Sequence, residues 1–502
     1  MELDPAACYR ALLARDARHD GRLFTCVTTT GVYCRPICPA RPPKFENCRF
    51  VPSAAAAQEA GFRPCLRCRP ESSPDLGAWN GTSATVSRAL KLIEAGALDD
   101  GDVEGLATRL GIGERQLRRL FRRHLGAAPV SVAQTRRLLL AKQLIHQTDL
   151  SMTQVALASG FGSVRRFNET FQQLYDRPPA DLRRRAVAGS GGPGLQLLLP
   201  YRAPYDWSAM LEFLAGRAIP GLEVVAGGSY SRVVEIGGAV GEITVGDAPA
   251  RSALRVDVRF PSLAALPAII ARVRRVFDLA ADPTAIGEAL ARDPRLRPLV
   301  EARPGLRVPG TWDGFEIAVR AVLGQQITVA GATRLAGKLV LAFGDGVGAH
   351  VATAGLTHAF PQPNRFDVDA IAALGMPRAR AIALAGLAAA VTADPGLFDP
   401  RADLSAAVAR LRALPGIGEW TAQYIAMRAL RESDAFLAGD VALQRILAEG
   451  PTRPGARDLV DRAEAWRPWR AYAVLHLWTA DAASRRALIP DIMKETPDAF
   501  AA

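Results

Sequence analysis

The stretch LPGIGEWTA, residues 414–422, decides how the C-terminal half of the chain folds. Two of its glycines, Gly416 and Gly418, form a tight turn between predicted helices. Such a turn exposes backbone N–H groups at the start of a helix, where they can hold a phosphate group. We therefore expect two helices joined by a turn that binds a phosphate backbone.

An aspartate follows this turn within FLAGDV, residues 436–441. The carboxylate of Asp440, placed near a sugar, could stabilise the positive charge that develops as a glycosidic bond breaks. It could also orient or activate a water molecule. A single aspartate is more often a helix cap, so the residue alone leaves both interpretations open.

Further motifs surround these residues along the C-terminal two thirds of the chain. They are PYDW (204–207), RPGLRVPG (303–310), AVLGQQ (321–326) and WRPWRAY (466–472). Through them, residues 198–490 resemble 3-methyladenine DNA glycosylase II (AlkA) of the helix-hairpin-helix superfamily. The resemblance implies that Asp440 is the catalytic carboxylate, that the 414–422 turn binds double-stranded DNA, and that Trp420, Tyr424 and Trp478 line a base pocket. Aromatic faces suit cationic alkylated purines, although core packing is the alternative for each tryptophan.

Two positions depart from the family pattern. Gln326 occupies the place of an apolar wedge that fills the gap left by an extruded base, so a polar amide is expected to contact DNA there. Bifunctional members carry a Schiff-base lysine two residues beyond the last glycine of the turn, where this chain has Trp420. We therefore expect a monofunctional glycosylase without lyase activity.

The cysteines point to a second site. All seven lie within the first 68 residues, at positions 8, 26, 34, 38, 48, 65 and 68. Four of them form two short-spaced pairs, Cys34 with Cys38 and Cys65 with Cys68, which can close a tetrahedral Zn²⁺ site. Buried cysteines without a metal are the alternative. A zinc-bound sulfur stays deprotonated at neutral pH, and the thiolate is the nucleophilic form.

The segments TTGVYCRPIC (29–38) and AGFRPCLRC (60–68) resemble the N-terminal domain of the Ada adaptive-response proteins, over residues 1–76. The resemblance implies that Cys34 accepts a methyl group from a DNA methylphosphotriester and that Cys38, Cys65 and Cys68 support it as zinc ligands. Methylation would change the formal charge of the centre from −2 to −1, and we hypothesise that DNA affinity then rises. Direct repair of O6-alkylguanine is not expected, because it requires a further cysteine beyond Cys68.

Between these regions, residues 84–186 have helical periodicity and contain two similar units. The first is VEGLATRLGIGERQLRRLF (103–121) and the second is VALASGFGSVRRFN (155–168). With YDRPP (175–179) they resemble the paired helix-turn-helix domain of AraC-type regulators, whose recognition helices enter the major groove. An ordinary amphipathic bundle is the alternative. The DNA-contacting residues expected are Arg115, Gln116, Arg118 and Arg119 in the first unit, and Arg165 and Arg166 in the second.

The whole chain has 502 residues and a formal net charge of +12, with the basic excess in residues 1–187. Such an excess suits a nucleic-acid partner. No apolar run approaches the roughly 20 residues of a membrane span, and no secretory signal is evident, so we expect a cytoplasmic protein without a membrane partner.

Linkers are expected at 71–83 and 188–194. The predicted fold is multidomain: a small zinc α/β domain (1–76), an all-α helix-turn-helix domain (84–186), a β-rich α+β domain (195–282) and an all-α helix-hairpin-helix domain (283–495).

Together the sequence predicts a regulator of alkylation-damage repair that accepts a methyl group at Cys34, activates transcription and excises alkylated bases with Asp440. Double-stranded DNA is the expected partner, and a transcriptional activator would also contact RNA polymerase. The alternative is a transcription regulator whose glycosylase-like domain is catalytically inactive.

Overall fold

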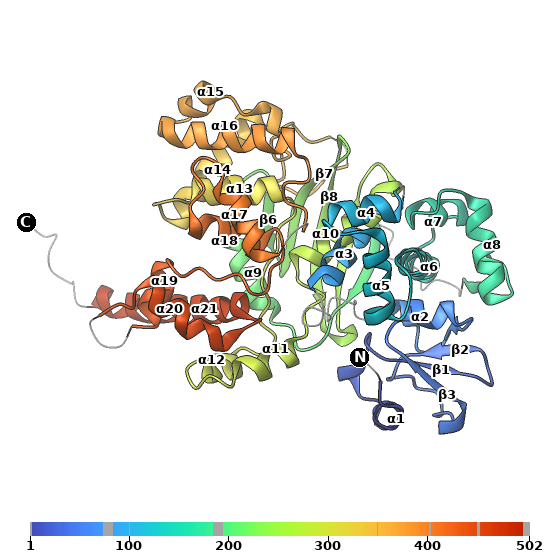
Figure 1. Ribbon diagram of the computed structural model, residues 1–502. Helices are drawn as coiled ribbons and strands as arrows, with labels where there is room; N and C mark the ends of the chain where they lie inside the picture. The colour runs from blue at the N-terminus through green and yellow to red at the C-terminus, as the bar shows by residue number, and fades with distance from the viewer. Residues whose placement is uncertain are drawn as a thin grey trace, which may run out of the picture.

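The computed structural model describes residues 3–73, 84–99, 101–183, 194–348, 350–400, 403–448 and 452–494. In Figure 1 the N-terminal segments, blue to teal, lie on one side of the molecule, and the C-terminal helices, yellow to red, lie on the other. Green strands lie between them. Among the described residues, no helix is long and apolar enough to cross a membrane. We refer to an N-terminal part (3–73), a first helical part (84–183), a sheet part (194–282) and a second helical part (283–494).

In the N-terminal part, a mixed sheet of the described strands has the order β3-β1-β2-β4. Strands β2 and β4 are parallel neighbours, with Tyr33 opposite Pro64. Cys34 ends β2 and Cys65 directly follows β4, so this pairing brings the two cysteine pairs to the same end of the sheet. The elements are α1 (Pro5–Leu13), β1 (Phe24–Val27), β2 (Val32–Cys34), β3 (Cys48–Val51), α2 (Ala54–Glu59) and β4 (Arg63–Pro64).

The predicted linkers lie largely outside the described residues. The predicted start of the first linker, residue 71, is too early. Pro70–Ser72 forms a 3-10 turn (η3) in which Glu71 is buried. A buried carboxylate needs a partner, and Glu71 finds it in the first helical part. The last residues of the N-terminal part are therefore packed against the helices that follow.

The first helical part contains the two predicted helix-turn-helix units, joined by the long helix α6. Side chains fix where several helices begin: Asp102 caps α4, Ser163 caps α8, and Ser151 with Gln154 forms a capping box at α7. The helices are α3 (Ala84–Glu94), α4 (Val103–Arg109), α5 (Glu114–Leu125), α6 (Pro129–Gln147), α7 (Met152–Ala158) and α8 (Val164–Tyr175).

The sheet part is an antiparallel sheet whose described strands have the order β5-β9-β8-β7-β6. Strands predicted at 230–236 and 253–258 are confirmed as β7 and β9. Edge strand β5 is covered by helix α6: the Gln143 amide donates to the Leu198 carbonyl at 2.9 Å, and the Leu198 N–H donates to Gln147 at 3.0 Å. Covering an edge in this way protects it from pairing with other chains. The elements are β5 (Leu195–Pro200), α9 (Trp207–Ala215), β6 (Glu223–Ala226), β7 (Ser229–Ile236), β8 (Ala239–Ala248), β9 (Ala253–Arg259) and α10 (Leu266–Val276).

The second helical part packs around helix α13, from whose Phe315 to Leu323 all but one side chain is buried. Helices α17 and α18 flank the PGIG turn, as the sequence predicts. The helices are α11 (Pro283–Leu290), α12 (Arg297–Ala302), α13 (Gly314–Leu323), α14 (Val329–Phe343), α15 (Val368–Ala373), α16 (Arg378–Ala393), α17 (Leu404–Arg412), α18 (Glu419–Arg428), α19 (Val441–Ile446), α20 (Ala456–Ala463) and α21 (Arg470–Lys494).

One buried ion pair joins the N-terminal part to the first helical part. The Lys142 ammonium on α6 lies 2.8 Å from the Glu71 carboxylate, and the two side chains are 0% and 1% exposed. The ammonium also donates to the Cys65 carbonyl at 3.3 Å and lies 5.8 Å from the ring centroid of Tyr175. Removing one member of a buried pair leaves an uncompensated charge, which is far more costly than losing both.

We therefore expect Lys142→Met to destabilise the N-terminal half by about 3–5 kcal/mol, measured as a lower denaturant midpoint of that half. The double variant Glu71→Gln/Lys142→Met should recover most of the loss, because no buried charge is then left unpaired: the other partner of Glu71, Arg69, is 39% exposed and can be solvated. Arg165→Met, which removes an exposed pair with Glu169, serves as the control and should change stability by less than about 1 kcal/mol. A Lys142→Met midpoint equal to wild type would contradict this account.

Candidate zinc centre, DNA-reading helices and base pocket

The four predicted ligands Cys34, Cys38, Cys65 and Cys68 come together. Their Sγ atoms all lie within 4.8 Å of one another, and each residue is buried. Backbone N–H groups point at two of the sulfurs: Arg35 N–H donates to Cys68 Sγ at 3.3 Å, and Arg67 N–H donates to Cys65 Sγ at 3.4 Å. Such donors stabilise thiolates, so the cluster has the environment of a metal site.

The geometry and chemistry of the cluster fit zinc. Four sulfurs around one tetrahedral Zn²⁺ are roughly 3.8 Å apart, given Zn–S bonds of about 2.3 Å, and the four Sγ atoms, all within 4.8 Å of one another, are close enough for such a site. Hydrogen bonding to the neighbouring thiols, together with burial, raises the pKa of the Cys34 thiol, and a bound cation would favour its thiolate form. Of the other cysteines, Cys8 and Cys26 are buried elsewhere in the N-terminal part, and Cys48 donates to the Lys44 carbonyl outside the cluster.

Arg35, between the first two ligands, ties the cluster to its surroundings. Its guanidinium pairs with the buried Asp20 through Nε at 2.8 Å and through Nη2, and Nη1 donates to the Cys68 carbonyl at 3.2 Å. Arg202 of the sheet part in turn donates to the Asp20 carbonyl at 2.9 Å. Burial lowers the pKa of Arg202 to about 10. The loop that follows Cys34 is thereby fixed to both the N-terminal and the sheet parts.

Helix α5 presents the predicted reading face. Leu117 and Phe121 are buried against the rest of the first helical part. The opposite face is exposed and carries Arg115, Gln116, Arg118 and Arg119, of which Arg118 pairs with Glu114 one turn earlier. The outward orientation predicted from the sequence is confirmed.

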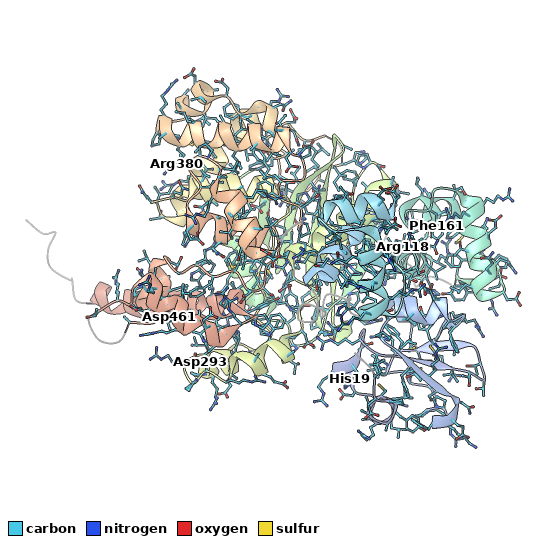
Figure 2. The ribbon with its side chains drawn as sticks, viewed as in Figure 1. His19, Arg118, Phe161, Asp293, Arg380 and Asp461 are labelled. Atoms are coloured by element: carbon cyan, nitrogen blue, oxygen red, sulfur yellow. The ribbon has the colours of Figure 1, made fainter. Side chains whose placement is uncertain are left out.

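Helix α8 repeats this pattern in the second unit. Phe167, Phe171 and Tyr175 are buried, whereas Arg165 and Arg166 are exposed near the start of the helix. An exposed face with basic side chains on each of these two helices is what a helix that enters the major groove requires. Figure 2 shows Arg118 and Phe161 labelled on the two units, on the side of the molecule away from Arg380.

The PGIG segment forms the tight turn between helices that the sequence predicts. Gly416 has φ +79°, and a Cβ there would approach Ala383 Cβ to 2.6 Å, so only glycine fits. Gly418 is the N-cap of α18, with open space around it. The Gln325 amide donates to the Gly416 carbonyl at 2.8 Å and so fixes the turn against the AVLGQQ loop.

Gln326 lies on the surface of that loop, with φ +60°. Its neighbour Ile327 is 38% exposed and lines the cavity described below. The structure therefore places an apolar side chain beside the polar residue that the sequence assigns to the wedge. Sequence reasoning missed Ile327, because the motif alone does not tell which of two adjacent side chains faces the cavity.

Asp440 lies at the wall of a cavity of about 610 Å³, between helices α18 and α21. It is the N-cap of α19, with Oδ1 accepting from the N–H groups of Ala442 and Leu443 at 3.0 and 3.1 Å. The indole Nε1 of Trp478 also donates to Oδ1, at 3.1 Å, and that of Trp420 donates to Oδ2, at 3.0 Å. Asp440 is thus both a helix cap and a carboxylate exposed to the cavity.

The three predicted aromatic residues stand together along this cavity. Trp420 and Tyr424 are stacked, with ring centroids 5.1 Å apart and an interplanar angle of 9°. Tyr424 and Trp478 are tilted, with centroids 6.5 Å apart. All three are partly buried and pack against the core, and all three also line the cavity.

Three further lining residues were not found from the sequence. The guanidinium of Arg217 lies 3.9 Å from the ring centroid of Phe213, and that of Arg428 lies 4.8 Å from it. Arg428 also donates to the Tyr424 hydroxyl at 2.6 Å. Desolvation by burial lowers the pKa of both arginines. Phe213 and Arg217 come from the sheet part, and nothing in their local sequence indicates that they reach this cavity.

The fold and these sites define a helix-hairpin-helix DNA glycosylase joined to a zinc-binding and a helix-turn-helix segment. Three family models match the chain: the metal binding domain of Ada at residues 7–71, a helix-turn-helix domain at 106–185, and the AlkA N-terminal domain at 196–313. Their order is the order of the sites along the sequence.

Similar proteins extend this result to nearly the whole chain. A protein of Mycobacterium tuberculosis named as a bifunctional transcriptional activator/DNA repair enzyme AlkA is 43% identical over 95% of this chain and 97% of its own. The DNA-3-methyladenine glycosylase 2 of Escherichia coli is 37% identical over 56% of this chain and 95% of its own. The 3-methyladenine DNA glycosylase structure from Archaeoglobus fulgidus shares the fold, with a TM-score of 0.50 and 22% identity over 57% of this chain and 98% of that one. The chain belongs to the family of AlkA-type bifunctional transcriptional activator/DNA repair enzymes.

The zinc site leads to a test of its ligands. Purified protein should contain one zinc ion per chain, and Cys38→Ser should lose it, because three thiolates hold Zn²⁺ less well than four. Cys48→Ser, which alters a cysteine outside the cluster, should keep the metal. The zinc content of each protein is measured by inductively coupled plasma mass spectrometry. Equal zinc in wild type and Cys38→Ser, or equal loss in both variants, would show that the cluster is not the site.

Proposed function

We propose that the chain is a DNA alkylation-damage protein with three linked roles. It accepts methyl groups from DNA methylphosphotriesters on Cys34, binds promoter DNA as a transcriptional activator, and excises alkylated bases of the 3-methyladenine type by hydrolysing their N-glycosidic bond. The observation that carries the glycosylase role is the position of Asp440, held between two indole N–H groups at the wall of an aromatic cavity.

The two carboxylate oxygens of Asp440 have different roles: one is held by the fold and the other faces the substrate. Oδ1 accepts three hydrogen bonds, from Ala442, Leu443 and Trp478, and is thereby fixed in place. Oδ2 accepts one, from Trp420, and keeps lone pairs free toward the cavity. Oδ2 is therefore the oxygen that would face the sugar, where its charge stabilises the oxocarbenium ion as the base leaves.

The aromatic residues hold the extruded base. The parallel faces of Trp420 and Tyr424 offer a stacking surface, and a cationic alkylated ring gains cation–π stabilisation there. The hairpin turn at Gly416 and Gly418 would hold a DNA phosphate through its N–H groups. Gln326, with Ile327 beside it, would enter the gap that the base leaves in the duplex.

We infer that the enzyme is a monofunctional glycosylase. Trp420 occupies the position of a Schiff-base lysine, and its N–H is committed to Asp440. None of the described residues lining the cavity is a lysine. Water, rather than an enzyme amine, is then the nucleophile at the sugar.

In the N-terminal part, Cys34 is the proposed acceptor, and Cys38, Cys65 and Cys68 would complete the zinc site. Zinc, when bound, supplies the positive charge that keeps sulfur as thiolate at neutral pH. Transfer forms a C–S bond at Cys34 and returns the phosphate diester as the leaving group, so each chain reacts once. The neutral thioether leaves the centre less negative and so less repelled by DNA.

The exposed arginines of α5 and α8 would then bind promoter DNA, with RNA polymerase as the partner that an activator requires. We propose a cytoplasmic location, where promoter and damaged DNA are both accessible. The proposed domains are 1–76, 84–186, 195–282 and 283–495.

Asp440→Asn tests the glycosylase role. Base release from alkylated duplex should fall by at least about 100-fold, because the charge that stabilises the sugar cation is lost. Binding of the same duplex should persist, since the hairpin is unchanged. Released bases are measured by chromatography and binding by fluorescence anisotropy. Full activity in Asp440→Asn would reject this assignment, and an inactive wild type would favour a regulator whose glycosylase-like domain is catalytically inactive.

The monofunctional assignment has its own test. Borohydride should trap no covalent adduct between wild type and DNA, because no enzyme amine forms a Schiff base with the sugar.

The methyl-acceptor role has a separate readout. After incubation with duplex containing a methylphosphotriester, peptide mass spectrometry should find one added methyl group, on Cys34. Cys48→Ser should behave as wild type, and Cys34→Ser should take up none. Methylation found at Cys48 or Cys68 instead would overturn the assignment of Cys34.

A further inference from the structure

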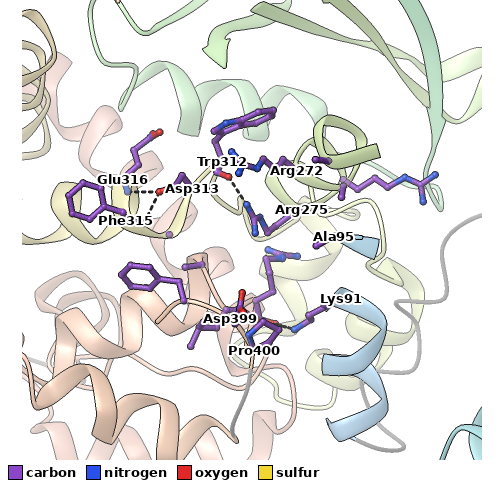
Figure 3. Close-up of a pocket in the computed structure, with 18 of the residues that line it drawn as sticks. Lys91, Ala95, Arg272, Arg275, Trp312, Asp313, Phe315, Glu316, Asp399 and Pro400 are labelled. Carbon is purple, nitrogen blue, oxygen red and sulfur yellow. Dashed lines mark hydrogen bonds between the residues drawn. The ribbon is translucent and has the colours of Figure 1, made fainter. Parts of the chain in front are cut away.

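Helix α3 of the first helical part reaches the glycosylase directly. The Lys91 ammonium donates to the carbonyls of Leu430 and Arg431, at 3.0 and 3.2 Å. These carbonyls follow closely after α18, the helix that carries Trp420 and Tyr424. Figure 3 shows Lys91 extending from its helix toward the segment near Asp399 and Pro400.

The two acceptors suit a cation. Carbonyls in the last turn of a helix and just beyond it lack helical partners and lie at the negative end of the helix dipole. Among the described residues, Lys91 makes no ion pair at hydrogen-bond distance, so its contacts are these two carbonyls. Desolvation lowers the pKa of Lys91, and the nearby Glu432 opposes that shift. The ammonium is therefore committed to the segment that ends α18.

The same turn is held firmly from the glycosylase side. Arg431 has φ +60°, and its guanidinium donates to the Val308 carbonyl at 2.8 Å and pairs with Asp278. Asp278 also accepts from the Tyr472 hydroxyl at 2.8 Å. The carbonyls that accept from Lys91 thus belong to a turn that is tied by side-chain hydrogen bonds to the body of the glycosylase part.

The contact of Lys91 lies at the edge of a cavity. A cavity of about 670 Å³ lies between α3, α10 and the segment around residues 427–433. Another described contact that crosses this boundary, the pair of Arg109 with Asp399 at 2.7 Å, ends on the loop before α17 and not on α18. Helix α3 also packs against α5, the first recognition helix. Lys91 thus stands between the DNA-reading face and the helix that lines the base pocket.

We propose that Lys91 is a positioning residue through which the DNA-binding part sets the placement of helix α18 and of the aromatic wall of the base pocket. The inference rests on the proposed glycosylase function. Lys91, a residue of the first helical part, would thus influence base excision through its hydrogen bonds to the carbonyls of Leu430 and Arg431.

The test uses the full-length chain and an alkylated duplex. Lys91→Met keeps the length of the side chain and removes the donors, and Arg109→Met is the matched control at the same boundary. We expect Lys91→Met to lower kcat for base release about tenfold with KM unchanged, because small misplacement of the pocket wall slows the chemical step. Lys91→Arg should restore most of kcat. Arg109→Met should match wild type.

The outcomes separate this inference from the proposed function. If wild type excises bases and Lys91→Met retains both kcat and KM, Lys91 has no positioning role. If Arg109→Met loses as much activity as Lys91→Met, docking in general matters and the specific contact does not. A Lys91→Met protein whose Tm falls and whose KM rises together with the loss of kcat would indicate a purely structural role, which also rejects the proposal. Absence of excision in wild type rejects the proposed function itself.

Discussion

Cations that donate hydrogen bonds to main-chain carbonyls hold the parts of this molecule together. Lys142 reaches the Cys65 carbonyl, Arg202 reaches that of Asp20, and Lys91 reaches those of Leu430 and Arg431. A carbonyl is present at every residue, so such contacts fix the position of the backbone regardless of the side chain it carries. Because each cation is partly or fully removed from water, leaving it without its acceptors would be costly. These donors add directional contacts to the hydrophobic cores that the parts share.

This arrangement leaves the chemistry at the surface of each part. The basic faces of α5 and α8 are exposed, the hairpin turn at Gly418 has open space around it, and the cavity beside Asp440 opens between the sheet part and the second helical part. The cysteine cluster, by contrast, is buried beside the junctions, with Arg35 linking it to Asp20 and so to the sheet part. A chemical change at the cluster therefore occurs where three parts of the chain meet.

Sequence reasoning recovered the features that depend on local spacing. The two cysteine pairs, the glycines of the hairpin turn and the outward arginines of the recognition helices each follow from a short motif. It did not recover features that depend on distant segments, such as Phe213 and Arg217 in the cavity beside Asp440, because their local sequence is ordinary. Ile327 was missed for a different reason: the left-handed backbone at Gln326, which periodicity does not reveal, decides which side chain turns toward the cavity.

Asp440 shows why a structural and a catalytic interpretation of one residue need not compete. A helix cap must present its carboxylate to N–H groups at a fixed angle, and Oδ1 does so with Ala442 and Leu443. That constraint removes rotational freedom from the side chain, so Oδ2 has a defined direction before any substrate arrives. Preorganised charge is worth more in catalysis than charge that must reorient. In the proposed mechanism the cap is therefore the means by which the fold aims the carboxylate, and the indole donors of Trp420 and Trp478 hold it at the cavity wall.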